Sequence, residues 1–71
     1  MKNTRLKVAI VESGLTHQEL AQRLNRDLDW ADSVSEQRIT RFVTNRATPS
    51  PAQRTAIARI LKQPATRLFP D

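Results

Sequence analysis

The sequence has no cysteine, one histidine and one glycine among its 71 residues. Without cysteine it can form neither a disulfide nor a thiolate metal site, so a reducing cytoplasm is the expected compartment. The single glycine, Gly14, excludes a glycine-rich phosphate-binding loop. No apolar run approaches the length of a membrane span, and Met1-Lys2-Asn3 leads into a helical pattern instead of a signal peptide.

The residues that catalysis or metal binding would need are also scarce. His17 is the single histidine, and a catalytic or metal-binding role would need a cysteine or a second histidine beside it. Asp27, Asp29 and Asp32 are spaced like part of a cation-binding loop, but the glycine and the closing glutamate of such a loop are missing. We therefore expect no enzyme activity, no metal, no cofactor and no small-molecule ligand.

Positive charge dominates the sequence, and it is unevenly distributed. The formal net charge is +5. Residues 26–33 carry one basic and three acidic side chains, whereas residues 34–71 carry seven basic and two acidic side chains. A basic excess confined to one part of a small domain is typical of nucleic-acid binding. The alternative is a basic surface with no partner, which becomes the weaker interpretation if the charge coincides with a DNA-binding pattern.

Two short helical patterns occupy the middle of the chain. The first covers residues 16–25: Thr16 and Glu19 form a potential capping box, and Asn25 is a possible stop. The second covers residues 35–46, with Ser35 as its N-cap. Its apolar stripe is Ile39, Phe42 and Val43, and its opposite face carries Gln37, Arg38, Thr40, Arg41 and Thr44. Two short helices, the second with a polar and basic outer face, are what a helix-turn-helix requires.

Helices are also predicted on both sides of this pair. Asn3 or Thr4 can cap a first helix that ends at Ser13, with Gly14 as its stop. A further helix begins with Ser50 as N-cap and Pro51 in its first turn. It is expected to bury Ala56, Ile57, Ile60 and Leu61 and to leave Arg54 and Arg59 exposed. A last turn runs from Pro64 to Pro70. The prediction is one all-α domain of five short helices over residues 1–71.

Three segments together resemble the Cro and C1 repressor-like (XRE-type) helix-turn-helix family. Leu15–Ala21 (LTHQELA) is similar to the family's opening L-T-Q-x-E-L-A. Ile39–Ser50 (ITRFVTNRATPS) is similar to its I-S-R-I-E-N-G-K-R-N-P-S, and Ile57–Phe69 (IARILKQPATRLF) to its closing I-A-x-A-L-G-V-S-x-x-x-L-F. The resemblance covers nearly the whole chain in register, apart from one insertion. It implies a five-helix, lambda-repressor-like domain.

The resemblance also implies a function. Members of this family bind double-stranded operator DNA and regulate transcription, so we expect a nucleoid-associated, Cro-like repressor of its own phage or mobile-element operon. Operons that encode anti-CRISPR proteins are among those regulated in this way. Because one small domain buries limited surface on DNA, a homodimer on a pseudo-palindromic operator is expected.

Candidate DNA contacts divide by role. Gln37 and Arg41 lie one helical turn apart and suit adenine and guanine, respectively. Glu36, Arg38 and Thr40 are the other candidates for contacts to base edges. The resemblance assigns the phosphate contacts to His17, Gln18, Ser35, Thr44, Arg46, Thr48 and Ser50. It assigns the dimer contact to Leu68 and Phe69.

The sequence departs from the family pattern at two places. The family often buries an Arg in the first helix against a Glu in the third, whereas Ile10 and Val43 stand at those positions. Replacing both members of a buried ion pair with apolar residues can be neutral or stabilising, so we expect Ile10 and Val43 to meet in the core. The second departure is an eight-residue insertion, residues 26–33, between the second and third helices.

The insertion contains Trp30, the single tryptophan. We expect a partly helical extension of the second helix, with a bulging loop as the alternative, and Trp30 packed over the domain's own apolar surface. The acidity of the insertion argues against contact with phosphates. A competing hypothesis for the function is an antitoxin-like protein-interaction module that grips its partner through residues 26–33.

Overall fold

The computed structural model describes residues 2–69, and the regular structure within that range is entirely helical. In chain order its α-helices are α1 (Thr4–Ser13), α2 (His17–Asp27), α3 (Glu36–Val43), α4 (Pro51–Leu61) and α5 (Ala65–Leu68). One 3-10 turn, η1 (Trp30–Asp32), lies between α2 and α3. The prediction of an all-α domain with five helices is therefore confirmed for the described residues. Pro70, expected to end the last turn, lies outside them.

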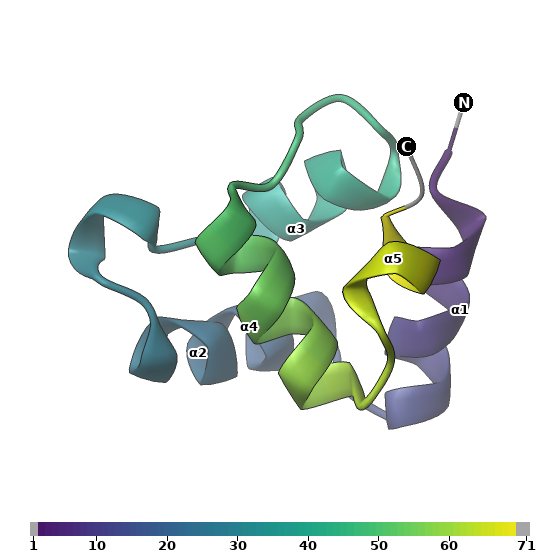
Figure 1. The fold of residues 1–71 in the computed structure, drawn as a ribbon, viewed down its shortest axis with the longest axis horizontal. Helices are drawn as coiled ribbons and strands as arrows, with labels where there is room; N and C mark the ends of the chain where they lie inside the picture. The colour runs from purple at the N-terminus through teal and green to yellow at the C-terminus, as the bar shows by residue number, and fades with distance from the viewer. Residues whose placement is uncertain (1, 70–71) are drawn as a thin grey trace.

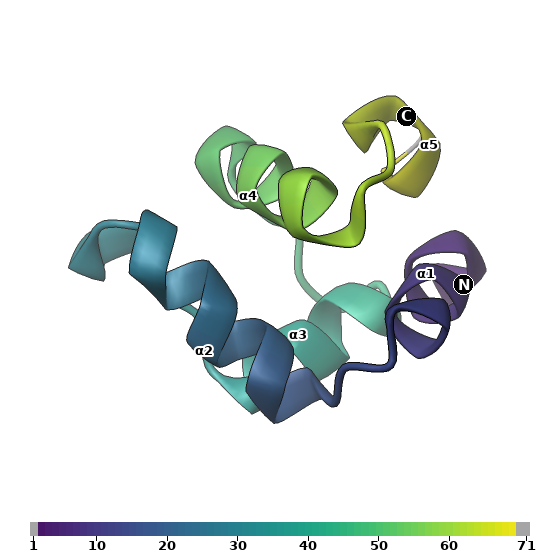
Figure 2. The same cartoon turned by 90° about the horizontal axis from the view of Figure 1, so that it is seen from below.

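The helices form two layers closed at one end by α1 (Figures 1 and 2). In the view from below, α4 and α5 lie on one side of the molecule and α2 and α3 on the other. The contacts agree with this arrangement, since α2 packs against both α3 and α4, and α1 touches α3, α4 and α5. One hydrophobic core lies between them. Its buried side chains are Leu6, Ala9, Ile10, Leu20, Ala21, Leu24, Val34, Ile39, Phe42, Val43, Ala56, Ile57, Ala58, Leu61 and Leu68.

Most helix ends follow from capping residues in the sequence. The Asn3 side chain accepts a hydrogen bond from the Leu6 N–H, and α1 ends at Gly14, whose φ of 76° is readily adopted by glycine. Thr16 with Glu19 and Ser50 with Gln53 form capping boxes at the starts of α2 and α4. The caps Asn3, Thr16 and Ser50, together with Glu19 and Gly14, occur at the predicted positions, whereas the part played by Gln53 was not predicted.

Asn3 also joins three helices. Its backbone N–H donates to the Val43 carbonyl at the end of α3, at 2.7 Å. Its side-chain Nδ2 donates to the Leu68 carbonyl in α5, also at 2.7 Å. Through its cap at Leu6 it begins α1. One residue therefore fixes the relative positions of the first, third and last helices by hydrogen bonds that part-burial shields from water.

The two apolar replacements on α1 and α3 are both buried. Ile10 is 2% exposed and Val43 is 5% exposed, and they belong to the same core. The two helices that carry them pack against each other. An apolar pair at these positions avoids the desolvation of a buried ion pair.

The third helix is shorter than predicted. The pattern suggested a helix to Arg46, but α3 ends at Val43 because Asn45 adopts the left-handed conformation, with φ of 62°. The Arg46 N–H then donates to the Arg41 carbonyl, and the Asn45 N–H donates to the Phe42 carbonyl. This is a Schellman motif, and asparagine is the residue that most often replaces glycine at its left-handed position. The stop signal, Asn45, is thus present in the sequence two residues after Val43, the last residue of the apolar stripe.

The insertion is partly helical, as expected. Helix α2 continues to Asp27, an extended Leu28 ends it, and η1 follows. Asn25 is not the stop of α2. Instead its side chain clamps Val34, accepting from the Val34 N–H at 2.8 Å and donating to the Val34 carbonyl at 2.9 Å. This pair of bonds closes the insertion at its base.

A second attachment joins the insertion to α4. The Ser50 hydroxyl donates to Asp32 Oδ1 at 3.1 Å, and Gln53 Nε2 donates to the Asp32 carbonyl at 2.8 Å. Both donors come from the capping box that begins α4. The insertion is therefore held at both ends by side-chain hydrogen bonds.

Three expectations about burial were wrong. Trp30 does not pack over the domain's own surface but is 90% exposed, because η1 points the indole away from the core. Arg54, expected outside, is half-buried with its Cζ atom 5.9 Å from the centre of the Phe69 ring. The aromatic face stabilises a guanidinium placed over it. Ile60 is half-buried at the edge of the core.

The burial of Val43 leads to a stability prediction. Val43→Glu should lower the free energy of unfolding by about 3–5 kcal/mol, because the carboxylate would be buried with no partner charge in the core that Val43 shares with Ile10. Chemical denaturation followed by circular dichroism measures this loss. Val11→Glu is the matched control, since Val11 is 69% exposed and should change stability by less than about 0.5 kcal/mol. Equal effects at the two positions would contradict the placement of Val43.

The clamp at the base of the insertion leads to a second prediction. Asn25→Ala removes both bonds to Val34 and should cost about 1–3 kcal/mol, since the Val34 groups are left part-buried without those partners. Gln22→Ala, at an exposed position of the same helix, should change stability by less than about 0.5 kcal/mol. Both are read from the same denaturation curves. An Asn25→Ala variant as stable as Gln22→Ala would show that the clamp does not hold the insertion.

Candidate nucleic-acid interface

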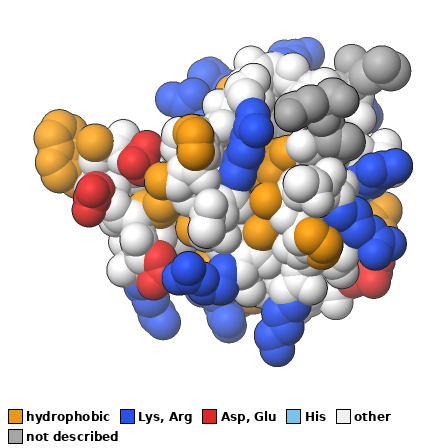
Figure 3. Space-filling model, viewed as in Figure 1, with side chains coloured by type: hydrophobic (Ala, Val, Ile, Leu, Met, Phe, Trp, Pro, Cys, Tyr) orange, Lys and Arg blue, Asp and Glu red, His pale blue; other side chains and the backbone are white. Residues whose placement is uncertain are grey.

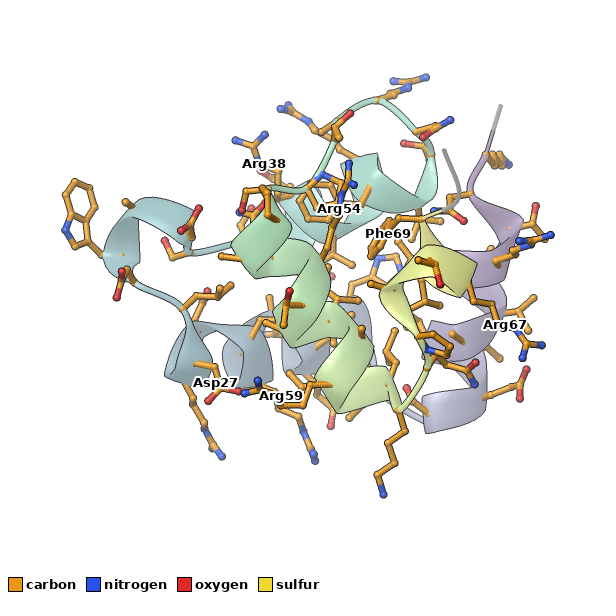
Figure 4. All side chains as sticks on the ribbon, in the orientation of Figure 1. Asp27, Arg38, Arg54, Arg59, Arg67 and Phe69 are labelled. Atoms are coloured by element: carbon orange, nitrogen blue, oxygen red, sulfur yellow. The ribbon has the colours of Figure 1, made fainter. Side chains whose placement is uncertain are left out.

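Helix α3 has one buried face and one exposed polar face. Ile39, Phe42 and Val43 enter the core, which turns the remaining positions outward. Ser35 caps the helix by accepting from the Arg38 N–H at 3.1 Å, so its backbone start is fixed. Arg38 projects outward (Figure 4). The exposed side chains include every residue considered for base contacts, namely Glu36, Gln37, Arg38, Thr40 and Arg41.

The start of α2 is joined to this face by a side-chain hydrogen bond. His17 Nδ1 lies 3.0 Å from Thr40 Oγ1, across 23 residues of sequence. The Thr40 hydroxyl also donates to the Glu36 carbonyl at 3.2 Å. A hydroxyl has one proton, so with that bond formed it is His17 Nδ1–H that donates to Thr40. The pair sets the distance between the start of α2 and the middle of α3.

The same hydrogen bond limits which further hydrogen bonds the His17 ring can make. With the proton on Nδ1, the neutral ring has Nε2 as an acceptor, and only the doubly protonated ring can donate a hydrogen bond to an anion. His17 therefore acts first as a brace between the two helices. Its neighbour Gln18 is exposed in the first turn of α2, where an amide side chain and backbone N–H groups are suited to anions.

The loop after α3 carries further polar side chains. Arg46 and Thr48 are exposed, and they follow directly from the Schellman motif that ends the helix. The Thr44 hydroxyl is half-buried and donates to the Thr40 carbonyl at 2.9 Å. Ser35 retains its hydroxyl proton while its oxygen caps α3. Ser35, Arg46 and Thr48 are therefore exposed, with hydrogen-bond donors still available.

Ser50 lies in a different environment. Its hydroxyl proton goes to the Asp32 carboxylate, and its oxygen accepts from the Gln53 N–H. A phosphate at this position would compete with Asp32 for the same proton and would be repelled by its charge. Ser50 therefore serves the insertion and α4.

The two residues considered for a dimer contact are largely used within the chain. Leu68 is 1% exposed, so its side chain has almost no surface left for a partner. Phe69 is half-buried against the core, with Arg54 over its ring (Figure 4). Neither side chain forms a free apolar patch.

Sequence reasoning did not identify the roles of Asn25, Asp32 and Gln53. Asn25 bonds to Val34 across the base of the insertion, and Asp32, within the insertion, accepts from Ser50 and Gln53. No local pattern indicates these tertiary hydrogen bonds. Gln53 carried a partial signal, because a Gln three residues after Ser50 completes a capping box.

Metal-binding clusters and membrane-spanning helices were also considered for the part of the chain that the structure describes. No group of three or more potential metal ligands occurs within residues 2–69. Among the same residues no helix is both long enough and apolar enough to cross a bilayer. Comparison of the chain with protein-family models, curated proteins and solved structures finds no match.

Proposed function

We propose that this protein binds double-stranded DNA sequence-specifically, with α3 in the major groove, and that it acts as a transcriptional repressor. One observation carries the proposal: the apolar residues of α3 are all buried while five polar side chains, two of them arginines, share its exposed face. An isolated helix of eight residues would not persist in water, so its packing supplies the rigidity that base recognition requires.

Base recognition is assigned to the middle of the exposed face. Gln37 and Arg41 stand one turn apart; an amide can pair with adenine and a guanidinium with guanine through two hydrogen bonds each. Glu36 can accept from the amino group of cytosine. Thr40 is held by His17 and Glu36, so its methyl group is presented in a fixed position. These side chains supply the sequence preference.

Phosphate contacts are assigned to the edges of the same face. Arg38, Arg46, Thr48, Ser35 and Gln18 carry donors on either side of α3 and at the start of α2. Contacts of this kind position a helix in the groove without reading sequence. The resemblance of the sequence to Cro and C1 repressor-like regulators supports the same assignment. Two copies placed roughly 34 Å apart would match successive major grooves of a pseudo-palindromic operator.

The electrostatic part of the proposal predicts a steep salt dependence. The logarithm of the DNA-binding constant should fall linearly with the logarithm of salt concentration, with a slope of about −0.9 for each phosphate neutralised. Arg46→Ala should make the slope less steep by about 0.9 per protomer. Arg67→Ala removes the same charge from exposed α5 and should leave the slope unchanged. Binding that is indifferent to salt between dilute and physiological buffer would exclude the interface.

The base-reading part is tested with DNA from the region flanking the protein's own gene. A gel shift should show retention of that DNA over unrelated duplex of equal length. Arg41→Ala should weaken binding to it by about 1–3 kcal/mol and reduce the preference over unrelated DNA, because a bidentate base contact is lost. Arg67→Ala again serves as the control. If Arg41→Ala weakened binding to both duplexes equally, Arg41 would be a phosphate contact and the base assignment would be wrong.

A further inference from the structure

Trp30 is the most exposed of the large hydrophobic side chains in residues 2–69, at 90% of its surface. It belongs to η1 in the insertion, and the insertion forms the end of the molecule farthest from α1 (Figure 1). At this end a protruding hydrophobic side chain lies among acidic ones (Figure 3). Tryptophan is enriched in the centres of protein interfaces and is costly to leave in water.

The backbone that carries Trp30 is already ordered. The Trp30 carbonyl accepts from the Ser33 N–H and from the Ser33 hydroxyl, at 3.2 and 2.8 Å. Asp32 is bound by the start of α4, and Asn25 closes the base of the insertion. Burying a side chain on such a backbone loses little further conformational entropy. The backbone is therefore pre-organised for the Trp30 side chain to insert into a hollow of a partner.

A hollow of about 370 Å³ lies beside the insertion, between the end of α2 and one face of α4. A cavity of roughly 150 Å³ can hold a benzene ring, so this hollow has room for an indole. Its walls combine apolar side chains with one acidic and one basic residue; the lining includes Leu28, Pro51, Ala52, Ala56, Asp27 and Arg59.

We propose that a second copy of this chain occupies the hollow: each copy places Trp30 in the hollow of the other, about a two-fold axis. Charge supports a second copy as the occupant. Trp30 is preceded by Asp29, and the hollow carries Arg59, which lies beside Asp27 (Figure 4). Two acidic insertions that met at the axis with no cation between them would repel each other. In the proposed arrangement each Asp29 instead approaches Arg59 in the hollow of the other copy.

Geometry supports the same occupant. Trp30 and the hollow are neighbours, because Leu28 lines the hollow and Trp30 follows two residues later. A single two-fold axis therefore generates both contacts. By contrast α5 offers little, since Leu68 is buried and Phe69 is covered by Arg54. None of the residues assigned to DNA contacts belongs to the insertion, so this association requires no DNA and stands independently of the proposed function.

Trp30 provides its own readout, because it is the single tryptophan of the chain. Without DNA, sedimentation velocity should show a concentration-dependent monomer–dimer equilibrium. The tryptophan emission should move to shorter wavelength over the same concentrations, since the indole leaves water as the dimer forms. Trp30→Ala should weaken the dimer by about 100-fold or more, because the residue is lost from both contacts. Val11→Ala, which trims another exposed hydrophobic residue, should leave the equilibrium unchanged.

Charge reversal tests the register of the two copies. Asp29→Arg alone and Arg59→Asp alone should each weaken dimerisation by about tenfold, because each places like charges together twice. The double variant should return the dissociation constant to near the starting value, which loss of folding could not do. Circular dichroism of every variant should show the helical content of the starting protein, as the control for folding.

Several outcomes would overturn the proposal. A dimer whose tryptophan emission does not change with concentration would place the interface elsewhere. The same conclusion follows if Trp30→Ala stays dimeric while Phe69→Glu becomes monomeric. A protein that remains monomeric at several hundred micromolar would exclude a second copy as the occupant. Failure of the double charge reversal to restore dimerisation would exclude the Asp29–Arg59 register.

Discussion

The apolar stripe of α3 can be buried in one orientation only, and much of the molecule depends on that constraint. Ile39, Phe42 and Val43 occupy three of its eight positions and all enter the shared core. A chain of this size has little apolar surface to spare, so the core cannot be completed without them. Once they are buried, the direction of every polar side chain on α3 is determined. The candidate interface is thus a consequence of how the core is filled.

Hydrogen bonds then set where α3 lies relative to its neighbours. Asn3 joins its C-terminal end to α1 and α5, and the His17–Thr40 bond joins its outer face to the start of α2. The first of these is partly shielded from solvent, whereas the second is exposed and contributes less to stability. Asn3 therefore stabilises the packing of α1, α3 and α5, whereas His17 positions the exposed Thr40 side chain on the outer face of α3.

The sequence was a reliable guide wherever the signal was local. Capping residues such as Thr16 and Ser50 and the apolar periodicity of each helix predicted the five helices, and the exposure of the polar face of α3 followed from its stripe. Errors arose where the outcome depended on tertiary neighbours. Arg54 was expected in solvent because its helical position is polar, but the approach of Phe69 from α5 half-buries it. Leu68 was expected to share a dimer contact, yet within the single chain it is 1% exposed and belongs to the core, where α5 packs against α1 and α4.

The insertion shows the same division within a single segment. Its partial helicity could be anticipated from the spacing of Leu20, Leu24 and Leu28, which continues the stripe of α2. The direction of Trp30 could not, because it is set by Asn25 and by Asp32, whose partners lie 9 and 18 residues farther along the chain. Those bonds hold the insertion at the end of the molecule opposite α1 (Figure 1), where the Trp30 side chain is 90% exposed. Substitutions in the insertion can therefore test the proposed self-association while α3 keeps both its packing and its polar surface.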